Sequence, residues 1–327
     1  MFDHKILRLF LLTIFILIFG ALGLTYFEGT ASPLDALWWS FVTITTVGYG
    51  DVTPTTVGGR VTGVIVMVFG IGLLGMFTAT VASIFVEGKL KEGKGLKTIT
   101  DTGHFIVCGW NYKAAEILEE LRADRKIADR PIVLLADLPE KPVADDNLRF
   151  VAGAVTNDGL QKANLPEAAG VLILSDESLD AQSRDAKVVF NTLTIRALHS
   201  KIYICAEITD AKNAQHCKMA GANEIVVIGA LSSHLLVQAA LDHGITHMIT
   251  ELVSNRAGSS LYKITPPANL IGRPFVEALP EMKRQHNAIP IAIESKDENR
   301  FISNPPMTYE VRPDDLFVII SEQRPET

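Results

Sequence analysis

The N-terminal part of the chain contains two long apolar runs, residues 9–27 and 61–86, and neither includes a charged side chain. A helix that crosses a bilayer needs about 20 mainly apolar residues, so each run is long enough to span a membrane. The first run is longer than the roughly 7–15 apolar residues of a secretory signal peptide, and a second run follows it. The pattern therefore predicts two transmembrane helices rather than a cleaved signal.

Charged side chains flank the two apolar runs unevenly. Basic residues precede the first run and follow the second: Lys5, Arg8, Lys89, Lys91, Lys94 and Lys97. The loop between the runs is mainly acidic, with Glu28, Asp35, Asp51 and a single Arg60. Because basic residues favour the cytoplasmic side of a membrane, we expect both ends of the chain in the cytoplasm and the loop outside. No segment repeats Arg or Lys at every third position, as a voltage sensor would.

The pattern changes after residue 86. Residues 87–97 are charged and contain glycine, which predicts a linker. From residue 104 onward, apolar runs of strand length alternate with helical patterns. The expected strands are residues 104–108, 131–135, 150–151, 171–174, 203–206 and 224–228, and the expected helices include 114–121, 181–198 and 211–219. This alternation indicates a parallel sheet with helices on both faces.

Two further patterns follow the predicted sheet. Residues 231–253 carry a helical stripe that Gly244 interrupts, and the simplest interpretation is a helical hairpin packed on its own sheet. Beyond residue 261, strand patterns at 262–264, 289–293 and 316–320 surround a short helix that begins near Pro274. We expect a small α+β unit there.

The loop between the two membrane runs carries the chain's most specific motif. Residues 45–51 read T-T-V-G-Y-G-D, and residues 33–45 predict a short helix that Ser32 caps and Pro33 begins. A dehydrated K⁺ needs many oxygen ligands of modest field strength, and a row of carbonyls that point the same way supplies them. Such a row requires backbone dihedrals that glycine adopts without steric cost, which explains Gly48 and Gly50.

This motif resembles the selectivity filter of potassium channels, in which backbone carbonyls replace the hydration shell of K⁺. The resemblance assigns the filter to Thr46, Val47, Gly48, Tyr49, Gly50 and Asp51. Inward carbonyls are expected from the first four of these residues, with the Thr46 hydroxyl as a lower ring. One chain makes one wall of such a site, and the resemblance implies a homotetramer in the lipid bilayer. The expected location is a bacterial or archaeal cell membrane.

Residues near the filter extend the resemblance. Trp38 and Trp39 resemble the aromatic cuff that braces the filter tyrosine in this family, and interfacial anchoring is the alternative. Some members pair the filter aspartate with a glutamate on the pore helix, but Val42 stands at that position. In the second membrane run, Gly70 and Gly75 align with a bend and a cavity-lining position of related channels. They are expected to form a gating hinge, and close helix packing is the alternative.

The turn after the first strand of the second half weakly resembles a dinucleotide fingerprint. That fingerprint reads G-x-G-x-x-G and is followed about 20 residues later by an acidic residue. Here only Gly109 is present, Asn111 and Ala114 take the other two places, and Asp137 ends the second strand.

Several motifs in residues 100–327 are more specific as a family signature than this partial fingerprint. The runs C-G-W at 108–110, V-A-G at 151–153, L-Q-K-A-N at 160–164, A-E at 206–207 and M-A-G-A at 219–222 together resemble an RCK domain (regulator of K⁺ conductance). This ligand-sensing, Rossmann-like module is attached to many prokaryotic potassium channels. The resemblance spans roughly residues 100–327 and implies a cytoplasmic gating ring. In RCK proteins the helix pair near 231–253 crosses over and clasps a neighbouring subunit.

The resemblance also implies ligand sites. A nucleotide, ADP or NAD, is expected at Gly109, Asn111 and Asp137. In a calcium-gated branch, an aspartate and two glutamates hold a cation, but the corresponding residues here are Ser175, Glu207 and Thr209. Ca²⁺ takes six or more oxygen ligands, so a calcium site would need neighbouring carboxylates. The candidate metal residues are Glu207, Asp176 and Asp210, and a solvated acidic loop is the alternative.

Composition excludes several other classes of protein. The net charge of −7 and the pI of about 5.6 argue against binding to nucleic acid. The three cysteines, Cys108, Cys205 and Cys217, lack metal-ligand spacing, and burial explains them. We find no catalytic constellation among the histidines and nucleophiles, and therefore do not expect an enzyme.

The sequence thus predicts a potassium-selective channel that an intracellular ligand gates through a ring of RCK domains. Its expected parts are an all-α pore domain at residues 1–98, an α/β Rossmann-like N-lobe at 99–245, and a crossover helix with an α+β C-lobe at 246–327. Two alternatives remain at this point. One is the RCK-type regulatory subunit of a potassium transport system, and the other is a membrane-anchored, nicotinamide-dependent oxidoreductase.

Overall fold

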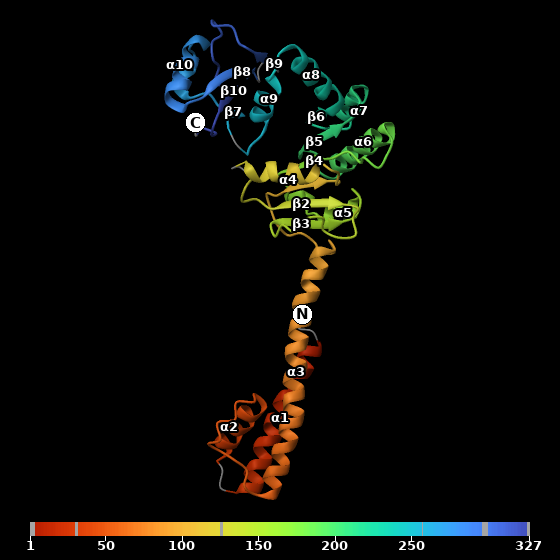
Figure 1. Ribbon diagram of the computed structural model, residues 1–327, viewed down its shortest axis with the longest axis vertical. Coiled ribbons are helices and arrows are strands. Elements are labelled where there is room, and N and C mark those ends of the chain that lie inside the picture. The colour runs from red at the N-terminus through yellow and green to blue at the C-terminus, as the bar shows by residue number, and fades with distance from the viewer. Residues whose placement is uncertain (1–3, 30–31, 125–126, 257, 296–299, 326–327) are drawn as a thin grey trace. The chain divides into compact units, whose positions relative to one another are not determined.

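The computed structural model describes residues 4–29, 32–124, 127–256, 258–295 and 300–325. The chain forms two compact units, Met1–Glu92 and Gly93–Thr327 (Figure 1). The first unit is helical, and the second contains two separate β-sheets. The predicted fold class, a helical membrane part followed by a Rossmann-like domain and a smaller α+β lobe, is confirmed.

Three helices make the first unit: α1 (His4–Glu28), α2 (Pro33–Ile44) and α3 (Val57–Gly93). The segments Ile6–Glu28 and Val57–Gly93 are long and apolar enough to cross a membrane. Helix α2 begins as predicted, because the Ser32 side chain accepts a hydrogen bond from the Asp35 amide at 3.1 Å and Pro33 occupies the first turn. These elements match the two predicted spans and the short helix before the filter motif.

Residues 87–93, predicted as part of a linker, instead continue α3 without a break to Gly93. The sequence pattern was misleading because charges and glycines are typical of linkers. In the structure, Lys91 and Glu87 form an ion pair of 2.7 Å one helical turn apart, a spacing that supports an exposed helix.

Glycines bring the three helices of the first unit together. A Cβ atom on Gly20 of α1 would lie 2.6 Å from the Ser40 hydroxyl of α2, and one on Gly23 would lie 2.5 Å from Thr62 of α3. Small residues at such positions allow close approach of membrane helices. Helix α1 therefore packs closely against both α2 and α3 of its own chain.

The first sheet of the second unit is parallel and has the strand order β3-β2-β1-β4-β5-β6. Its strands are β1 (Phe105–Cys108), β2 (Ile132–Ala136), β3 (Leu148–Ala152), β4 (Gly170–Ile173), β5 (Tyr203–Ile208) and β6 (Glu224–Val227). The connecting helices are α4 (Ala114–Ala123), α5 (Asn157–Lys162), α6 (Ala181–Leu198) and α7 (Ala214–Met219). Two apolar clusters, one around Ile106 and one around Val107, show that both faces of the sheet are covered. The order of the strands across the sheet changes direction between β1 and β4. Doubly wound sheets bind ligands at such a switch point, beyond the carboxyl ends of the strands.

The second sheet is antiparallel, with the order β7-β10-β8-β9. Its strands are β7 (Ser260–Ile264), β8 (Ile289–Ser295), β9 (Arg300–Ser303) and β10 (Asp315–Ser321), and α10 (Phe275–His286) packs against it. Strand β9 was absent from the sequence prediction. Its exposed residues give no apolar alternation that would have marked it.

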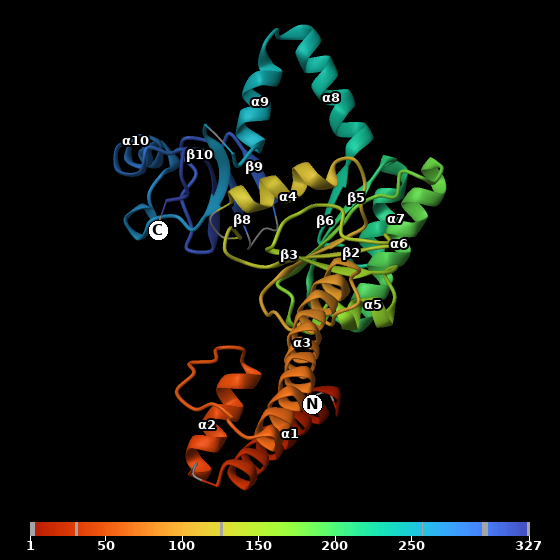
Figure 2. The ribbon, with the colours of Figure 1, turned by 60° about the horizontal axis from the view of Figure 1, so that its bottom comes forward.

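The helical hairpin departs from expectation. Helices α8 (Ile228–Leu241) and α9 (Ile245–Val253) are separated by Gly244 at a φ of 91°. Within the described chain, neither helix contains a buried residue, and Figure 2 shows the pair projecting beyond the sheet. The expectation that this hairpin packs on its own sheet is wrong. Its apolar stripe faces solvent instead, with Leu231, Leu236, Val237, Leu241, Met248 and Val253 more than half exposed.

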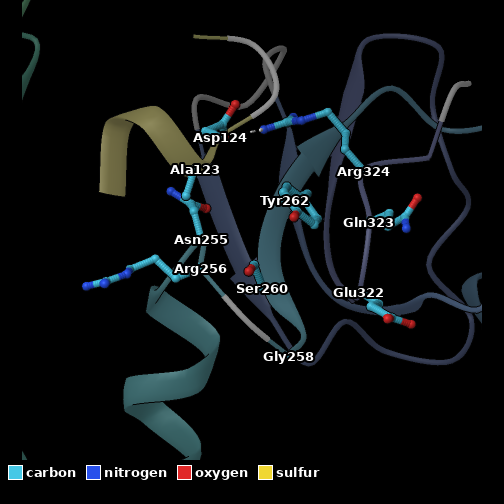
Figure 3. A pocket seen from close by; sticks show the side chains of 10 residues that line it. All are labelled: Ala123, Asp124, Asn255, Arg256, Gly258, Ser260, Tyr262, Glu322, Gln323 and Arg324. Atoms are coloured by element: carbon cyan, nitrogen blue, oxygen red, sulfur yellow. Dashed lines mark ion pairs between the residues drawn. The ribbon is translucent and has the colours of Figure 1, made fainter. Parts of the chain in front are cut away.

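The two lobes of the second unit meet at the C-terminal half of α4. Glu120 accepts hydrogen bonds from the Ser254 hydroxyl at 2.9 Å and the Asn255 amide at 2.7 Å. Asp124 lies 4.0 Å from Arg324 beside a cavity of about 280 Å³, and Arg324 lies over the Tyr262 ring (Figure 3). Carboxylates in α4 and directly after it therefore bind the C-lobe and the segment that leads into it, while α4 begins shortly after the Gly109 turn.

Candidate functional site

The filter motif forms an irregular loop between α2 and α3. Left-handed φ values occur at every second residue, with 62° at Thr46, 55° at Gly48 and 75° at Gly50. The two glycines take these dihedrals as predicted. Thr46 was not predicted to do so, and a left-handed non-glycine residue costs on the order of 1–3 kcal/mol. Such strain is typical of functional loops.

The end of α2 holds this loop in place. The Val47 amide donates to the Val42 carbonyl at 3.0 Å, and the Thr46 amide donates to the Thr43 carbonyl at 3.1 Å. These carbonyls belong to the last turn of the helix, where intrahelical donors are missing. The start of the filter motif therefore completes the C-terminal hydrogen bonds of α2.

Trp38 contacts the filter loop at two residues. Its Nε1 donates to Asp51 Oδ2 at 2.9 Å, and its ring stacks on Tyr49 with 5.9 Å between centroids and 8° between planes. The hydrogen bond from Trp38 lowers the pKa of Asp51 below its usual value. Asp51, which has Val42 in place of a glutamate partner on α2, is thus held by a neutral donor.

Trp39 has a different environment. Its side chain is only 6% exposed and packs with Leu24 and Ala36 between helices of the first unit. It also lines a cavity of about 360 Å³ behind the filter, together with Gly48 and Tyr49. Of the two predicted supports, Trp38 contacts Tyr49 by ring stacking, and Trp39 packs between the helices and lines the cavity beside the loop.

The glycines predicted as a hinge have unequal surroundings. Gly70 is buried, and a Cβ atom there would lie 2.8 Å from Ile44 at the end of α2. A Cβ on Gly75 would meet no atom of the described chain within 4 Å. Helix α3 is continuous through both residues. Gly70 therefore has a packing role in this structure, and a hinge at either residue stays a prediction.

Replacing Gly70 with alanine should destabilise the first unit, because the added methyl group overlaps Ile44. Overpacking of this kind costs about 1–3 kcal/mol. The matched control is Gly75→Ala, which should leave the melting temperature of the full-length protein in detergent nearly unchanged. An unchanged melting temperature in Gly70→Ala, combined with altered open probability, would instead favour the hinge.

In the second unit, the predicted nucleotide residues lie at the carboxyl ends of neighbouring strands. The Gly109 amide donates to the Leu135 carbonyl of β2 at 2.9 Å, and Asp137 is exposed just after β2. Gly109 has a φ of 95°, and a Cβ there would lie 3.2 Å from the Leu174 carbonyl. The structure thus brings the Gly109 turn beside the strand that Asp137 ends.

Asn111, the third predicted nucleotide residue, is engaged within the protein. It is 8% exposed, and its Nδ2 donates to the Ser175 carbonyl at 3.1 Å while its Oδ1 accepts from the Lys113 amide. This side chain ties the turn after β1 to the loop after β4.

Lys113, which the sequence analysis missed, pairs with two carboxylates at this edge. Its ammonium group hydrogen-bonds Glu207 at the end of β5 and lies 3.5 Å from Glu177. The Glu207 side chain is 8% exposed and also accepts from the Ser175 amide at 3.1 Å. Burial acts to lower the pKa of Lys113, but the bond with Glu207 outweighs it and the pKa is raised. The only sequence signal was a lysine at the start of a helix that follows a central strand.

The candidate metal residues each have other partners. Asp176 pairs with Lys187 at 2.7 Å, and this hydrogen bond lowers the pKa of Asp176 to about 2. Asp210 accepts from the Lys212 amide at 2.9 Å, and Glu207 is bound to Lys113. Within the described ranges, no group of three or more His, Cys, Asp or Glu side chains is placed to hold a metal ion. The structure therefore does not gather these three carboxylates within one chain.

The sequence analysis also missed Asp185, which lies at the same carboxyl-terminal edge of the parallel sheet. It is 1% exposed and accepts three hydrogen bonds, from the amides of Thr209 and Asp210 and from Asn213 Nδ2, at 2.8–3.0 Å. A buried carboxylate needs such donors. Asp185 therefore fixes the loop after β5 rather than facing a ligand.

Comparison with known proteins adds family matches for both units. Residues 11–87 match an ion channel family, and residues 105–228 match the TrkA-N domain. The calcium-gated potassium channel TvoK of Thermoplasma volcanium is 32% identical over 296 residues, which cover 89% of this chain and 82% of that channel. A putative potassium channel protein of Bacillus subtilis, YugO, is 28% identical over 88% of this chain and 87% of its own.

A solved structure supports the fold of the second unit. The human SLO3 gating ring superposes with a TM-score of 0.53 and 19% identity, over 67% of this chain and 44% of that chain. The relatives above are named as channels, which confirms a channel over an oxidoreductase or a separate regulatory subunit. This chain therefore belongs to the family of ligand-gated prokaryotic potassium channels in which a pore of two membrane helices precedes an RCK domain.

Proposed function

We propose that four copies of this chain surround one K⁺ pathway. In each chain the carbonyls of Thr46, Val47, Gly48 and Tyr49 face the ion, and the Thr46 hydroxyl adds the lowest ring. The observation that carries this proposal is the alternation of left-handed φ values at Thr46, Gly48 and Gly50. Without such values, successive carbonyls of an extended chain point to opposite sides.

The two contacts of Trp38 with the filter loop support the same assignment. Trp38 holds Tyr49 by stacking and Asp51 by a hydrogen bond, so the loop has a defined position before an ion enters. Pre-positioned carbonyls need little reorganisation when K⁺ loses its water, and this favours selective and rapid passage.

Both termini of the chain would lie in the cytoplasm of a bacterial or archaeal cell. The basic residues that flank the two membrane segments support this orientation. The RCK domains then form an intracellular ring. The apolar faces of α8 and α9, which are exposed in one chain, would be covered by a second copy.

The proposed ligand of the ring is a nucleotide, ADP or NAD, between the Gly109 turn and Asp137. Ligands of doubly wound sheets bind at the carboxyl ends of the strands, and an acidic residue after the second strand hydrogen-bonds the ribose. Asp137 is exposed at that position. Asn111 would contribute by holding the turn, since its side chain is already bonded to Ser175.

Calcium is the second candidate ligand, because the Thermoplasma relative is named as calcium-gated. A site that includes Glu207, Asp176 and Asp210 would require these carboxylates to leave Lys113, Lys187 and the Lys212 amide. The contacts in one chain thus favour the nucleotide.

Ion flux from liposomes that contain only the purified chain tests the proposal. K⁺ should pass much faster than Na⁺, and ADP, NAD⁺ or Ca²⁺ on the RCK side should change the K⁺ rate. Cross-linking should give a tetramer. Equal rates for K⁺ and Na⁺ would contradict the filter assignment, whereas selective flux that no ligand alters would contradict the assignment of the ligand.

A further inference from the structure

The ammonium group of Lys113 lies between carboxylates from two other segments of the N-lobe. It hydrogen-bonds the Glu207 carboxylate at the end of β5 and lies 3.5 Å from Glu177 in the loop after β4. The second oxygen of Glu207 accepts from the Ser175 amide at 3.1 Å and lies 3.5 Å from Asn111 Nδ2. Each oxygen of Glu207 therefore already accepts a hydrogen bond from its own chain.

The local sequence does not explain a lysine at position 113. Lys113 is the N-cap residue of α4, and its side chain makes no capping hydrogen bond. Asn, Asp, Ser and Thr are preferred at this position, and the partial positive charge of a helix N-terminus disfavours a cation there. Residues that break a local rule are expected at sites that require them. The carboxylates beside Lys113 supply such a requirement.

Glu207 needs a positive charge because of its burial. Its side chain is only 8% exposed, whereas that of Glu177 is 29% exposed. Burying a carboxylate is costly unless an opposite charge and hydrogen bonds compensate it. The Ser175 amide is a neutral donor, so the compensating charge comes from Lys113.

A calcium ion at Glu207 would have to displace this ammonium group. Ca²⁺ takes six to eight oxygen ligands, and it would have to bind the same carboxylates that Lys113 holds. Because Lys113 is part of the chain, its effective concentration beside Glu207 is high and does not vary with the concentration of any free ion. A free cation therefore competes with a partner that cannot diffuse away.

We propose that Lys113 determines which class of ligand this edge accepts. Its ammonium group takes the place of an exchangeable cation at Glu207 and excludes divalent cations from the end of β5. Calcium, the second candidate of the proposed function, is thereby kept from Glu207, while the Gly109 turn and Asp137 stay open to a nucleotide. This inference rests on the proposed function only where it concerns gating, since exclusion of the ion is a property of binding.

Titration calorimetry with CaCl₂ on the full-length protein in lipid nanodiscs tests this exclusion. Lys113→Ala should bind Ca²⁺ at least about tenfold more tightly than the unaltered chain, with a dissociation constant of about 10⁻⁴–10⁻³ M, the weak end of known calcium sites. Lys113→Arg keeps a cation beside Glu207 and should not gain this binding. The matched control is Lys187→Ala, which releases Asp176 from a more exposed pair and should gain none. Absence of a gain in Lys113→Ala would overturn the proposal.

Glu207→Gln guards against misfolding of Lys113→Ala. Added to Lys113→Ala, it should abolish the gained Ca²⁺ binding, and a gain that survives would contradict a site at Glu207. In the otherwise unaltered chain it should leave any Ca²⁺ binding unchanged, because Lys113 already keeps the ion from Glu207. Loss of Ca²⁺ binding in Glu207→Gln alone would overturn the proposal without any Lys113 variant. K⁺ flux that no ligand alters counts against the proposed function, while the titration still decides the role of Lys113.

Discussion

Replacing Gly48 with alanine should abolish K⁺ selectivity while leaving the chain folded. Gly48 has a φ of 55°, and holding an L-residue there costs roughly 1–2 kcal/mol in each chain. The filter loop avoids this cost by rotating the peptide, which moves the carbonyls of Val47 and Gly48 away from the ion. No described atom lies within 4 Å of the added Cβ, so the effect comes from the backbone rather than from a collision.

The measurement is the ratio of K⁺ to Na⁺ flux in liposomes, together with the melting temperature. Gly72→Ala is the matched control, because it adds the same methyl group in α3 where the described chain has no atom within 4 Å. We expect the control to keep both the flux ratio and the melting temperature. A normal flux ratio in Gly48→Ala would show that these carbonyls do not ligate K⁺.

Replacing Lys113 with methionine should destabilise the second unit by about 3 kcal/mol. The change leaves the Glu207 carboxylate, which is 8% exposed, without its ammonium partner. Removing one member of a buried ion pair costs about 3–5 kcal/mol, and the lower value applies because the Lys113 side chain is 21% exposed. The free energy of urea unfolding, measured on the full-length protein at neutral pH, reports the loss.

Two further variants separate the ion pair from other effects of this change. Lys187→Met removes a lysine whose pair with Asp176 is more exposed, and such pairs contribute about 0–1 kcal/mol. Adding Glu207→Gln to Lys113→Met removes the uncompensated charge and should restore most of the lost stability. Equal losses in the two lysine variants would mean that Glu207 gains nothing from Lys113.

Local sequence patterns predicted most of the fold. The uncharged runs, the cap at Ser32 and the strand–helix alternation each depend on neighbouring residues, and they predicted the membrane helices, α2 and the parallel sheet. The prediction stopped α3 too early because charges and glycines occur in exposed helix ends as well as in linkers. It misplaced the α8–α9 hairpin because an apolar stripe predicts that a helix packs against something but does not identify the surface against which it packs.

The candidate sites were less predictable, since they depend on contacts between distant residues. The glycines of the filter follow from its motif, but the left-handed Thr46 does not. The ion pair of Lys113 and Glu207 joins residues that are 94 positions apart. No local sequence pattern near either residue predicts this pair. The sequence suggests Asp176 and Asp210 as metal ligands, but it does not show that Lys187 and a backbone amide bind them in one chain.

The exposed hairpin of α8 and α9 has a consequence for the life of the protein in the cell. Contiguous apolar side chains in water promote non-specific association, and cells continuously remove such species with chaperones and proteases. If a second copy covers the hairpin, as proposed above, a newly made chain that meets no sister chain keeps Leu236, Leu241 and Val253 in water. Lone subunits should therefore be short-lived, and synthesis of many copies near one another at the membrane would favour their survival.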